Sequence, residues 1–203
     1  MKTVVVLFSP ESRLVAAFTT RKIRQWPPAG GLTAVSRSTA EEHLLRQVLP
    51  FFEKWRWRGA AEVELKFDTR DGRHKVIEIN PRFPAYLRFP CECRLDLPVM
   101  AVEAALGAKT VSGADFPAYV VGASFLNPIL FARTVLSAVR HGGLHNPELR
   151  NAVREMRAAG PLFLQLVDDP LPVFGLALRR AFRTGPPATP DRLRVVRPAS
   201  TGN

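Results

Sequence analysis

The chain of 203 residues contains only two cysteines, Cys91 and Cys93, which lie in the sequence C-E-C. Residues i and i+2 of an extended chain point the same way, so a disulfide between them would be strained. No histidine or further cysteine follows at the spacing of a zinc finger. The scarcity of cysteine argues against a disulfide scaffold and a thiolate metal site, and it predicts reduced thiols in a cytoplasmic protein.

The sequence also lacks an uninterrupted apolar run of the length that a membrane span needs. The apolar stretch Met1–Phe8 is too short for a signal sequence, and Ser9-Pro10 breaks it like a turn. Residues 118–139 are apolar, but Asn127-Pro128 and Arg133 divide them into pieces shorter than the roughly 20 residues of a span. We therefore expect buried strand and helix there rather than a membrane span.

Acidic residues are scarce relative to basic ones. The chain has 18 Asp and Glu against 29 Lys and Arg, a formal net charge of +11. Such a charge favours anionic partners, namely nucleotides, nucleic acid or a membrane surface. The basic residues are scattered without a run of five or six, which is also typical of a solvated arginine-rich surface. No aromatic-plus-basic RNA-binding signature is present, so a basic module for nucleic acid or anionic membrane is the alternative hypothesis.

Histidine is equally sparse, with four residues in the whole chain. None of them stands near an acidic or cysteine partner in a pattern that would indicate a catalytic triad. We interpret all four as structural or surface residues: His43, His74, His141 and His145.

The first half of the chain carries strand and turn signals with two helices between them. Residues 83–95 have the composition of a loop. The predicted elements are strands at 4–8, 14–18 and 21–26, a helix capped by Ser38 or Thr39 that runs to about Trp57 and ends at Gly59, a hairpin that turns at Asp71-Gly72, and a helix that begins at Asp96-Leu97-Pro98.

From Phe116 onward the pattern favours helices. A strand is predicted at 119–125, helices at 128–140, 147–159 and 171–182, and a Pro/Arg-rich disordered tail from 184. The predicted fold class is α+β, an antiparallel sheet with flanking helices plus a mostly helical C-terminal extension. The predicted divisions are residues 1–113, 114–183 and 184–203.

The hairpin holds the most informative polar residues. Alternation along its second strand points Glu78, Asn80 and Arg82 the same way, and the turn brings Glu64 back towards Glu78. Carboxylate and amide oxygens of this kind suit Mg²⁺, and a guanidinium suits a phosphate or carboxylate. The alternatives are a solvated carboxylate at Glu64, a turn residue at Asn80 and an ordinary surface arginine at Arg82.

Several ordered pieces resemble one known family. Basic R-K-I-R-Q at 21–25 precedes a Pro/Gly loop, and Glu64 lies five residues beyond Gly59. E-I-N-P-R at 78–82 follows the hairpin, and a helix from Asp96-Leu97 ends in A-A-L-G. Residues 2 to about 107 thereby resemble the C-terminal lobe of an ATP-grasp enzyme, a fold shared by biotin carboxylase, carbamoyl-phosphate synthetase and carboxylate–amine ligases.

The resemblance implies a role for each matched residue. Glu64 and Glu78 would be acidic metal ligands and Asn80 the amide ligand, together placing Mg²⁺ (or Mn²⁺) on the β- and γ-phosphates of ATP. Arg82 would be catalytic, contacting the transferred phosphate or the acyl substrate. Lys22 and Arg24 would lie near the phosphates. Enzymes of this class activate a carboxylate as an acyl-phosphate, which an amine then attacks.

The sequence departs from the family pattern in three places. The lysines of the other lobe and its glycine-rich lid are missing, and Arg94-Leu95 stands where the family usually keeps a glycine. Gly30-Gly31 does not open a helix directly and is more typical of a turn than of a phosphate cradle. We therefore expect half of a nucleotide cleft that is inactive alone, whether as a fragment, a degenerate copy or a subunit whose partner chain supplies the N-terminal lobe.

Overall fold

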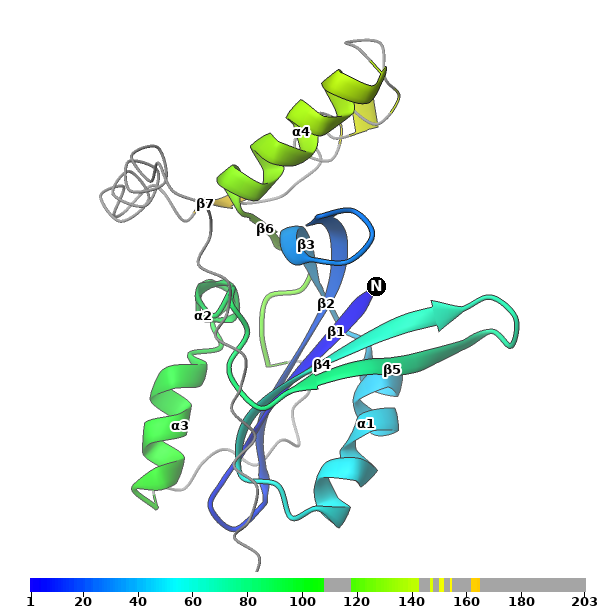
Figure 1. Cartoon of the computed structure of the whole chain (residues 1–203). Helices are drawn as coiled ribbons and strands as arrows, with labels where there is room; N and C mark the ends of the chain where they lie inside the picture. The colour runs from blue at the N-terminus through cyan, green and yellow to red at the C-terminus, as the bar shows by residue number, and fades with distance from the viewer. Residues whose placement is uncertain (108–117, 143–146, 148–149, 152–153, 155–161, 165–203) are drawn as a thin grey trace, which may run out of the picture. The chain divides into compact units, whose positions relative to one another are not determined.

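The computed structural model describes residues 1–107, 118–142, 147, 150–151, 154 and 162–164. One seven-stranded sheet in the order β5-β4-β1-β2-β3-β6-β7 forms its centre (Figure 1), with antiparallel neighbours except for the parallel pair β6–β7. The elements are β1 Lys2–Phe8, β2 Leu14–Trp26, β3 Leu32–Thr39, α1 Glu42–Lys54, β4 Gly59–Asp68, β5 Arg73–Asn80, α2 Arg88–Glu92, α3 Leu97–Ala105, β6 Ser124–Leu126, α4 Pro128–Gly142 and β7 Leu162–Leu164. The predicted α+β class, an antiparallel sheet with flanking helices, is confirmed.

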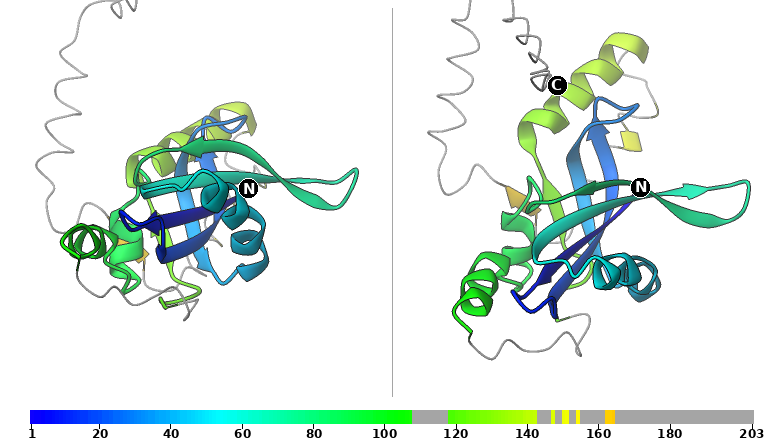
Figure 2. Two further views of the ribbon diagram at one scale, coloured as in Figure 1. Left: turned by 90° about the horizontal axis from the view of Figure 1, so that it is seen from below. Right: turned by 60° about the horizontal axis from the view of Figure 1, so that its bottom comes forward.

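The central strand β1 is apolar on both faces because a helical layer covers each side of the sheet. Val4 and Val6 pack with α1, whereas Val5 and Leu7 belong to the core that α2 and α3 cover. Figures 1 and 2 show α1 on one side of the sheet and α2 with α3 on the other. We call these two sides the α1 face and the site face.

The first two predicted strands pair as expected, but the third does not exist as a separate strand. Residues 21–26 are the second half of β2, and the true third strand is β3, which the sequence reading missed. The segment L-T-A-V-S-R-S-T has few of the large apolar residues that signal a strand. Its hydrogen bonds come from pairing with β2 and β6 on either side.

The prediction that Ser38 or Thr39 caps α1 is wrong. Both residues lie in β3, and the hydroxyl of Ser38 donates to the carbonyl of Val120, 2.8 Å away. Glu41 occupies the N-cap position without a side-chain capping bond. The helix ends at Lys54, earlier than predicted, because the chain turns there towards Gly59, the first residue of β4.

The second helix is confirmed, together with its cap. The carboxylate of Asp96 accepts a hydrogen bond from the backbone N–H of Val99 at 3.2 Å. The preceding segment is not only loop, as predicted, because it contains the short helix α2. Its Phe89 is fully buried against Phe18, with ring centroids 5.4 Å apart, so tertiary packing explains a helix that local sequence did not signal.

Residues beyond 113 extend the same sheet. The strand predicted at 119–125 is present as the shorter β6, and the helix predicted at 128–140 is present as α4. The predicted helix at 171–182 and the tail from 184 lie outside the described residues, as does most of the helix at 147–159. The three divisions of the chain stay predictions. Within the part of the chain that the structure describes, no helix has the length and apolar character to cross a membrane.

Candidate functional site

The hairpin of β4 and β5 brings the predicted oxygen ligands onto one face. Glu64 pairs directly with Glu78, and Asn80 pairs with Glu62. Directly opposed residues of an antiparallel pair project to the same side of the sheet, here the site face. The register of the β4–β5 pair shifts only between Glu64 and Leu65, so the shift does not separate these paired residues. The predicted placement of Glu64 beside Glu78 is therefore what the structure shows, and the metal-binding roles stay predictions.

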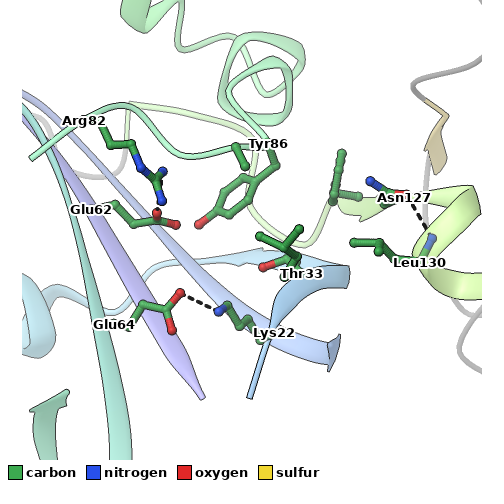
Figure 3. Close-up of a pocket in the computed structure, with 12 residues that line it drawn as sticks. Lys22, Thr33, Glu62, Glu64, Arg82, Tyr86, Asn127 and Leu130 are labelled. Atoms are coloured by element: carbon green, nitrogen blue, oxygen red, sulfur yellow. Dashed lines mark hydrogen bonds and ion pairs between the residues drawn. The ribbon is translucent and has the colours of Figure 1, made fainter. Parts of the chain in front are cut away.

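Glu64 forms an ion pair with a lysine that reaches across from β2. Lys22 Nζ donates to Glu64 Oε1 at 2.5 Å (Figure 3), and the two side chains are only 5% and 15% exposed. Strand β1 lies between β4 and β2, so the pair bridges two strands that are not neighbours. The structure thus places Lys22 beside Glu64, and its predicted position near the phosphates stays a prediction.

Glu62 is a site residue that the sequence reading missed. Its side chain is 5% exposed, and Arg82 Nη1 lies 3.5 Å from Glu62 Oε2. Burial raises the pKa of the Glu62 carboxyl above its usual value. The available signal was the same alternation that pointed to Asn80, because Glu62 and Glu64 are i and i+2 on the same strand.

We call Glu62, Glu64, Glu78 and Asn80 the polar row. Three buried hydroxyls lie between this row and the core. Tyr86 points at Glu62 (Figure 3), and Thr3 and Thr20 lie beside its hydroxyl. None of these three oxygens meets the geometry of a hydrogen bond within the described residues. Burial, reinforced by the charge of Glu62, raises the pKa of Tyr86 far above its usual value, so this phenol stays neutral.

Tyr86, together with the charged side chains described above, lines a cleft that opens to solvent. One wall carries Lys22, Glu62, Glu64 and Arg82, whose formal charges cancel. The opposite wall comes from segments to which the sequence reading gave no role. The lining residues from those segments are Leu32, Thr33, Ala85, Phe125, Asn127 and Leu130.

Asn127 fixes part of this opposite wall. Its side-chain oxygen accepts a hydrogen bond from the backbone N–H of Leu130 at 3.1 Å, which caps the first turn of α4. Figure 3 shows this contact across the cleft from Lys22 and Glu64. The residues around 125–130 therefore shape the cleft, although no sequence motif singled them out.

Glu78 and Asn80 lie outside the cleft lining, with Glu78 exposed and Asn80 half-buried. Among the residues described, no group of three or more His, Cys, Asp or Glu could hold a metal by itself. Mg²⁺ usually takes one or two carboxylates and completes its shell with substrate phosphates and water. Two facing carboxylates and a neighbouring amide fit that requirement.

A second groove adjoins the cleft and shares Lys22 with it. Its charged side chains are all basic, namely Lys22, Arg24 and Lys66. We call it the basic groove. Arg24, predicted near the phosphates, lies here rather than in the cleft because the pairing of β2 with β3 is irregular between Lys22 and Arg24.

The Gly30-Gly31 loop is required by packing. A Cβ at Gly31 would lie 2.2 Å from the backbone oxygen of Trp26, so only glycine fits the turn between β2 and β3. Gly31 also contributes to the cleft lining. The close backbone approach explains this glycine without a phosphate ligand.

His43, His74 and both cysteines lie outside the cleft lining, and His145 lies outside the described residues. The rings of His43 and His74 are tilted against each other, with centroids 5.9 Å apart, near the hairpin turn. Cys91 and Cys93 are free thiols, and burial raises the pKa of Cys93 to about 11. Neither pair contributes to the chemistry of the cleft.

Neither a protein-family profile nor a curated protein matches the sequence. Solved structures do resemble it. Pyruvate carboxylase from Rhizobium etli (T882A, with acetyl coenzyme-A) aligns at a TM-score of 0.46 and 16% identity over 61% of this chain and 13% of its own. The biotin carboxylase domain of 2-oxoglutarate carboxylase from Hydrogenobacter thermophilus, in complex with MgADP, ADP and bicarbonate, aligns at 0.46 and 14% over 61% and 28%.

N5-carboxyaminoimidazole synthetase from Staphylococcus aureus aligns at a TM-score of 0.37 and 12% identity over 51% of this chain and 29% of its own. The aligned part thus spans between 13% and 29% of the lengths of these three proteins. With TM-scores below 0.5 and identities below 25%, these likenesses are similarities of structure and assign no function.

Proposed function

We propose that this chain forms one side of a Mg²⁺–ATP site in an ATP-grasp protein that activates a carboxylate for attack by an amine. The observation that carries the proposal is the pairing of Glu64 with Glu78 on the site face, with Asn80 beside them. Such a set of oxygens on rigid strands matches what Mg²⁺ needs when phosphates complete its shell.

Each residue has a distinct task in this proposal. Glu64, Glu78 and Asn80 hold the metal, which when bound neutralises charge on the outer phosphates. Arg82, whose side chain is 54% exposed, presents a guanidinium to the transferred phosphate or to the substrate carboxylate. Lys22 and Arg24 supply further positive charge for the phosphate chain.

Phosphoryl transfer of this kind depends on positioning and charge neutralisation more than on covalent help from the protein. The cleft combines two cations and two carboxylates, with Lys22, Glu62 and Glu64 on strands and a largely apolar wall facing them. The acyl-phosphate would form where Arg82 can orient the substrate carboxylate.

The nucleotide needs a second wall. In the family that the motifs resemble, a second lobe completes the nucleotide cleft, so we propose that a further lobe, in the same polypeptide or in a partner chain, closes this one. We expect the 203-residue chain alone to bind Mg²⁺–ATP weakly, with a Kd above about 100 µM. Isothermal calorimetry checks this, and micromolar binding by the chain alone would contradict the need for a second lobe.

The metal site itself can be tested separately from the nucleotide. We expect Mn²⁺ to broaden the amide NMR signals of β4 and β5 around Glu64 and Glu78 selectively. Glu78→Gln should remove most of this broadening, whereas Glu42→Gln, an exposed carboxylate on α1, should leave it intact. Uniform broadening over all exposed carboxylates would reject the metal site.

The net charge of +11 and the basic groove support a second candidate, a module that binds nucleic acid or anionic membrane. That function predicts salt-dependent binding to random duplex DNA or acidic vesicles. It also predicts that Glu78→Gln has no effect, while removal of residues 184–203 abolishes binding. Selective Mn²⁺ broadening without DNA or vesicle binding would favour the ATP-grasp proposal.

A further inference from the structure

Lys22 occupies a singular position between the two concave surfaces. It lines both the cleft and the basic groove. Its ammonium lies 2.5 Å from Glu64 Oε1, and 5% of its side chain is exposed. The cation beside this proposed metal ligand is thus a side chain of the protein itself.

Because of this contact, Lys22 and a metal ion would compete for the carboxylate of Glu64. A cation held on a largely buried carboxylate opposes a divalent cation there, because the two positive charges would repel at short range in a medium of low dielectric. The contact also restrains Lys22, because an ammonium held by Glu64 is less available to phosphates in the basic groove. Metal and phosphates therefore both depend on where this one ammonium lies.

We propose that Lys22 is a shared cation that couples the two ligands. Glu64 holds it in the free protein, and phosphates in the basic groove draw it away and leave Glu64 open to the metal. Metal and phosphates then each raise the affinity for the other, as linkage requires. The inference rests on the proposed function, because it takes Glu64 as a metal ligand and the groove as the phosphate site.

The side chain and its surroundings suit such a movement. Lysine carries a compact charge with three donors on a flexible four-carbon stem, so it can change partners without moving the backbone. Arg24 and Lys66 stand in the groove with no acidic side chain among its lining residues. An anion that enters the groove therefore meets Arg24 and Lys66 and can recruit Lys22 as a third cation.

The first test measures binding of Mn²⁺ alone, by electron paramagnetic resonance of the free ion. Lys22→Met should bind Mn²⁺ at least about fivefold more tightly than the wild type, within the usual range of site coupling. Arg21→Met is the matched control, because it removes one positive charge from the adjacent residue, which lies outside the cleft and groove linings. Lys22→Arg, which keeps the charge, should resemble the wild type.

The second test measures binding of ATP in EDTA, without metal, by NMR titration. Glu64→Gln releases Lys22 and should tighten this binding about fivefold or more. Glu78→Gln removes an equal charge from the neighbouring strand without touching Lys22 and should change it less. The double variant Lys22→Met/Glu64→Gln should lose the gain. Circular dichroism establishes that each variant is folded.

The outcomes separate the inference from the function on which it rests. If the wild type binds Mn²⁺ but Lys22→Met binds it no more tightly than Arg21→Met does, the shared-cation proposal is overturned and the metal site stands. If neither the wild type nor Lys22→Met binds Mn²⁺, and Glu64→Gln does not bind ATP, both are overturned. Tighter Mn²⁺ binding by Lys22→Met together with tighter metal-free ATP binding by Glu64→Gln supports the proposal.

Discussion

The two faces of the sheet begin alike and diverge at strand β4. On the α1 face, β4 directs Val63 and Leu65 into an apolar core in which neither has any exposed surface. On the site face, the alternate positions are Glu62, Glu64 and Lys66. A helix covers the first set, and the cleft and groove open over the second. The difference shows that a strand with one apolar face and one charged face can contribute to the core and to a ligand site at the same time.

The largest expected effect is the loss of stability when the core of the α1 face is disrupted. Phe52 is fully buried and stacks on Phe8 with ring centroids 5.5 Å apart. Phe52→Ala should lower the free energy of unfolding by about 3–5 kcal/mol, because it removes apolar contacts and leaves a cavity. Phe51→Ala, at a neighbouring position that is 45% exposed, should cost under about 1 kcal/mol. Equal losses in urea denaturation would show that α1 does not pack as described.

A smaller effect separates two tyrosines in the core of the site face. The hydroxyl of Tyr119 donates to Thr39 O at 2.6 Å and accepts from Thr19 N at 3.0 Å. Tyr119→Phe should cost about 1–2 kcal/mol, because it removes both bonds and leaves the backbone N–H of Thr19 without this acceptor. Tyr86→Phe removes a hydroxyl without such bonds and should change stability by less than about 0.5 kcal/mol. Thermal denaturation of both variants measures the contrast.

The sequence predicted most residues of the polar row through one rule, the alternation of side chains along a strand. Alternation along β5 and the hairpin turn indicated that Glu78 and Asn80 share a face with Glu64, and the pairing bears this out. The same rule applied to β4 would have found Glu62. The ion pair between Lys22 and Glu64 was beyond the rule, because it joins residues 42 apart across an intervening strand.

Other elements were lost to sequence reading for physical reasons. Strand β3 consists largely of serine, threonine and small residues, so it carries no apolar signal of its own and depends on its neighbours for hydrogen bonds. Helix α2 forms where Phe89 packs into the core. The far wall of the cleft comes from residues 125–130, which reach it only through the order of the strands.

The next effect concerns the helices that cover the two faces. α3 has a side-chain cap at Asp96, whereas α1 has none. Asp96→Ala should lower the free energy of unfolding by about 1 kcal/mol through loss of the capping bond to Val99 N. Glu103→Ala, on the exposed side of α3, serves as the control and should be nearly neutral. A neutral Asp96→Ala would mean that packing alone fixes the start of α3.

The last prediction concerns the two thiols, whose rates of alkylation report how well the core of the site face excludes solvent. Cys93 is fully buried and its pKa is raised to about 11, whereas Cys91 is half-buried with a pKa that burial also raises. Since the thiolate is the reactive form, iodoacetamide at pH 8 should modify Cys91 slowly and Cys93 only after unfolding. Raising the pH to 9 should speed the reaction of Cys91 by increasing its thiolate fraction, while Cys93 stays protected by burial.

Cys91→Ser should abolish labelling of the native protein and Cys93→Ser should leave it unchanged. Mass spectrometry distinguishes the two sites, and equal labelling of both thiols in the native protein would show that the core under α2 opens to solvent.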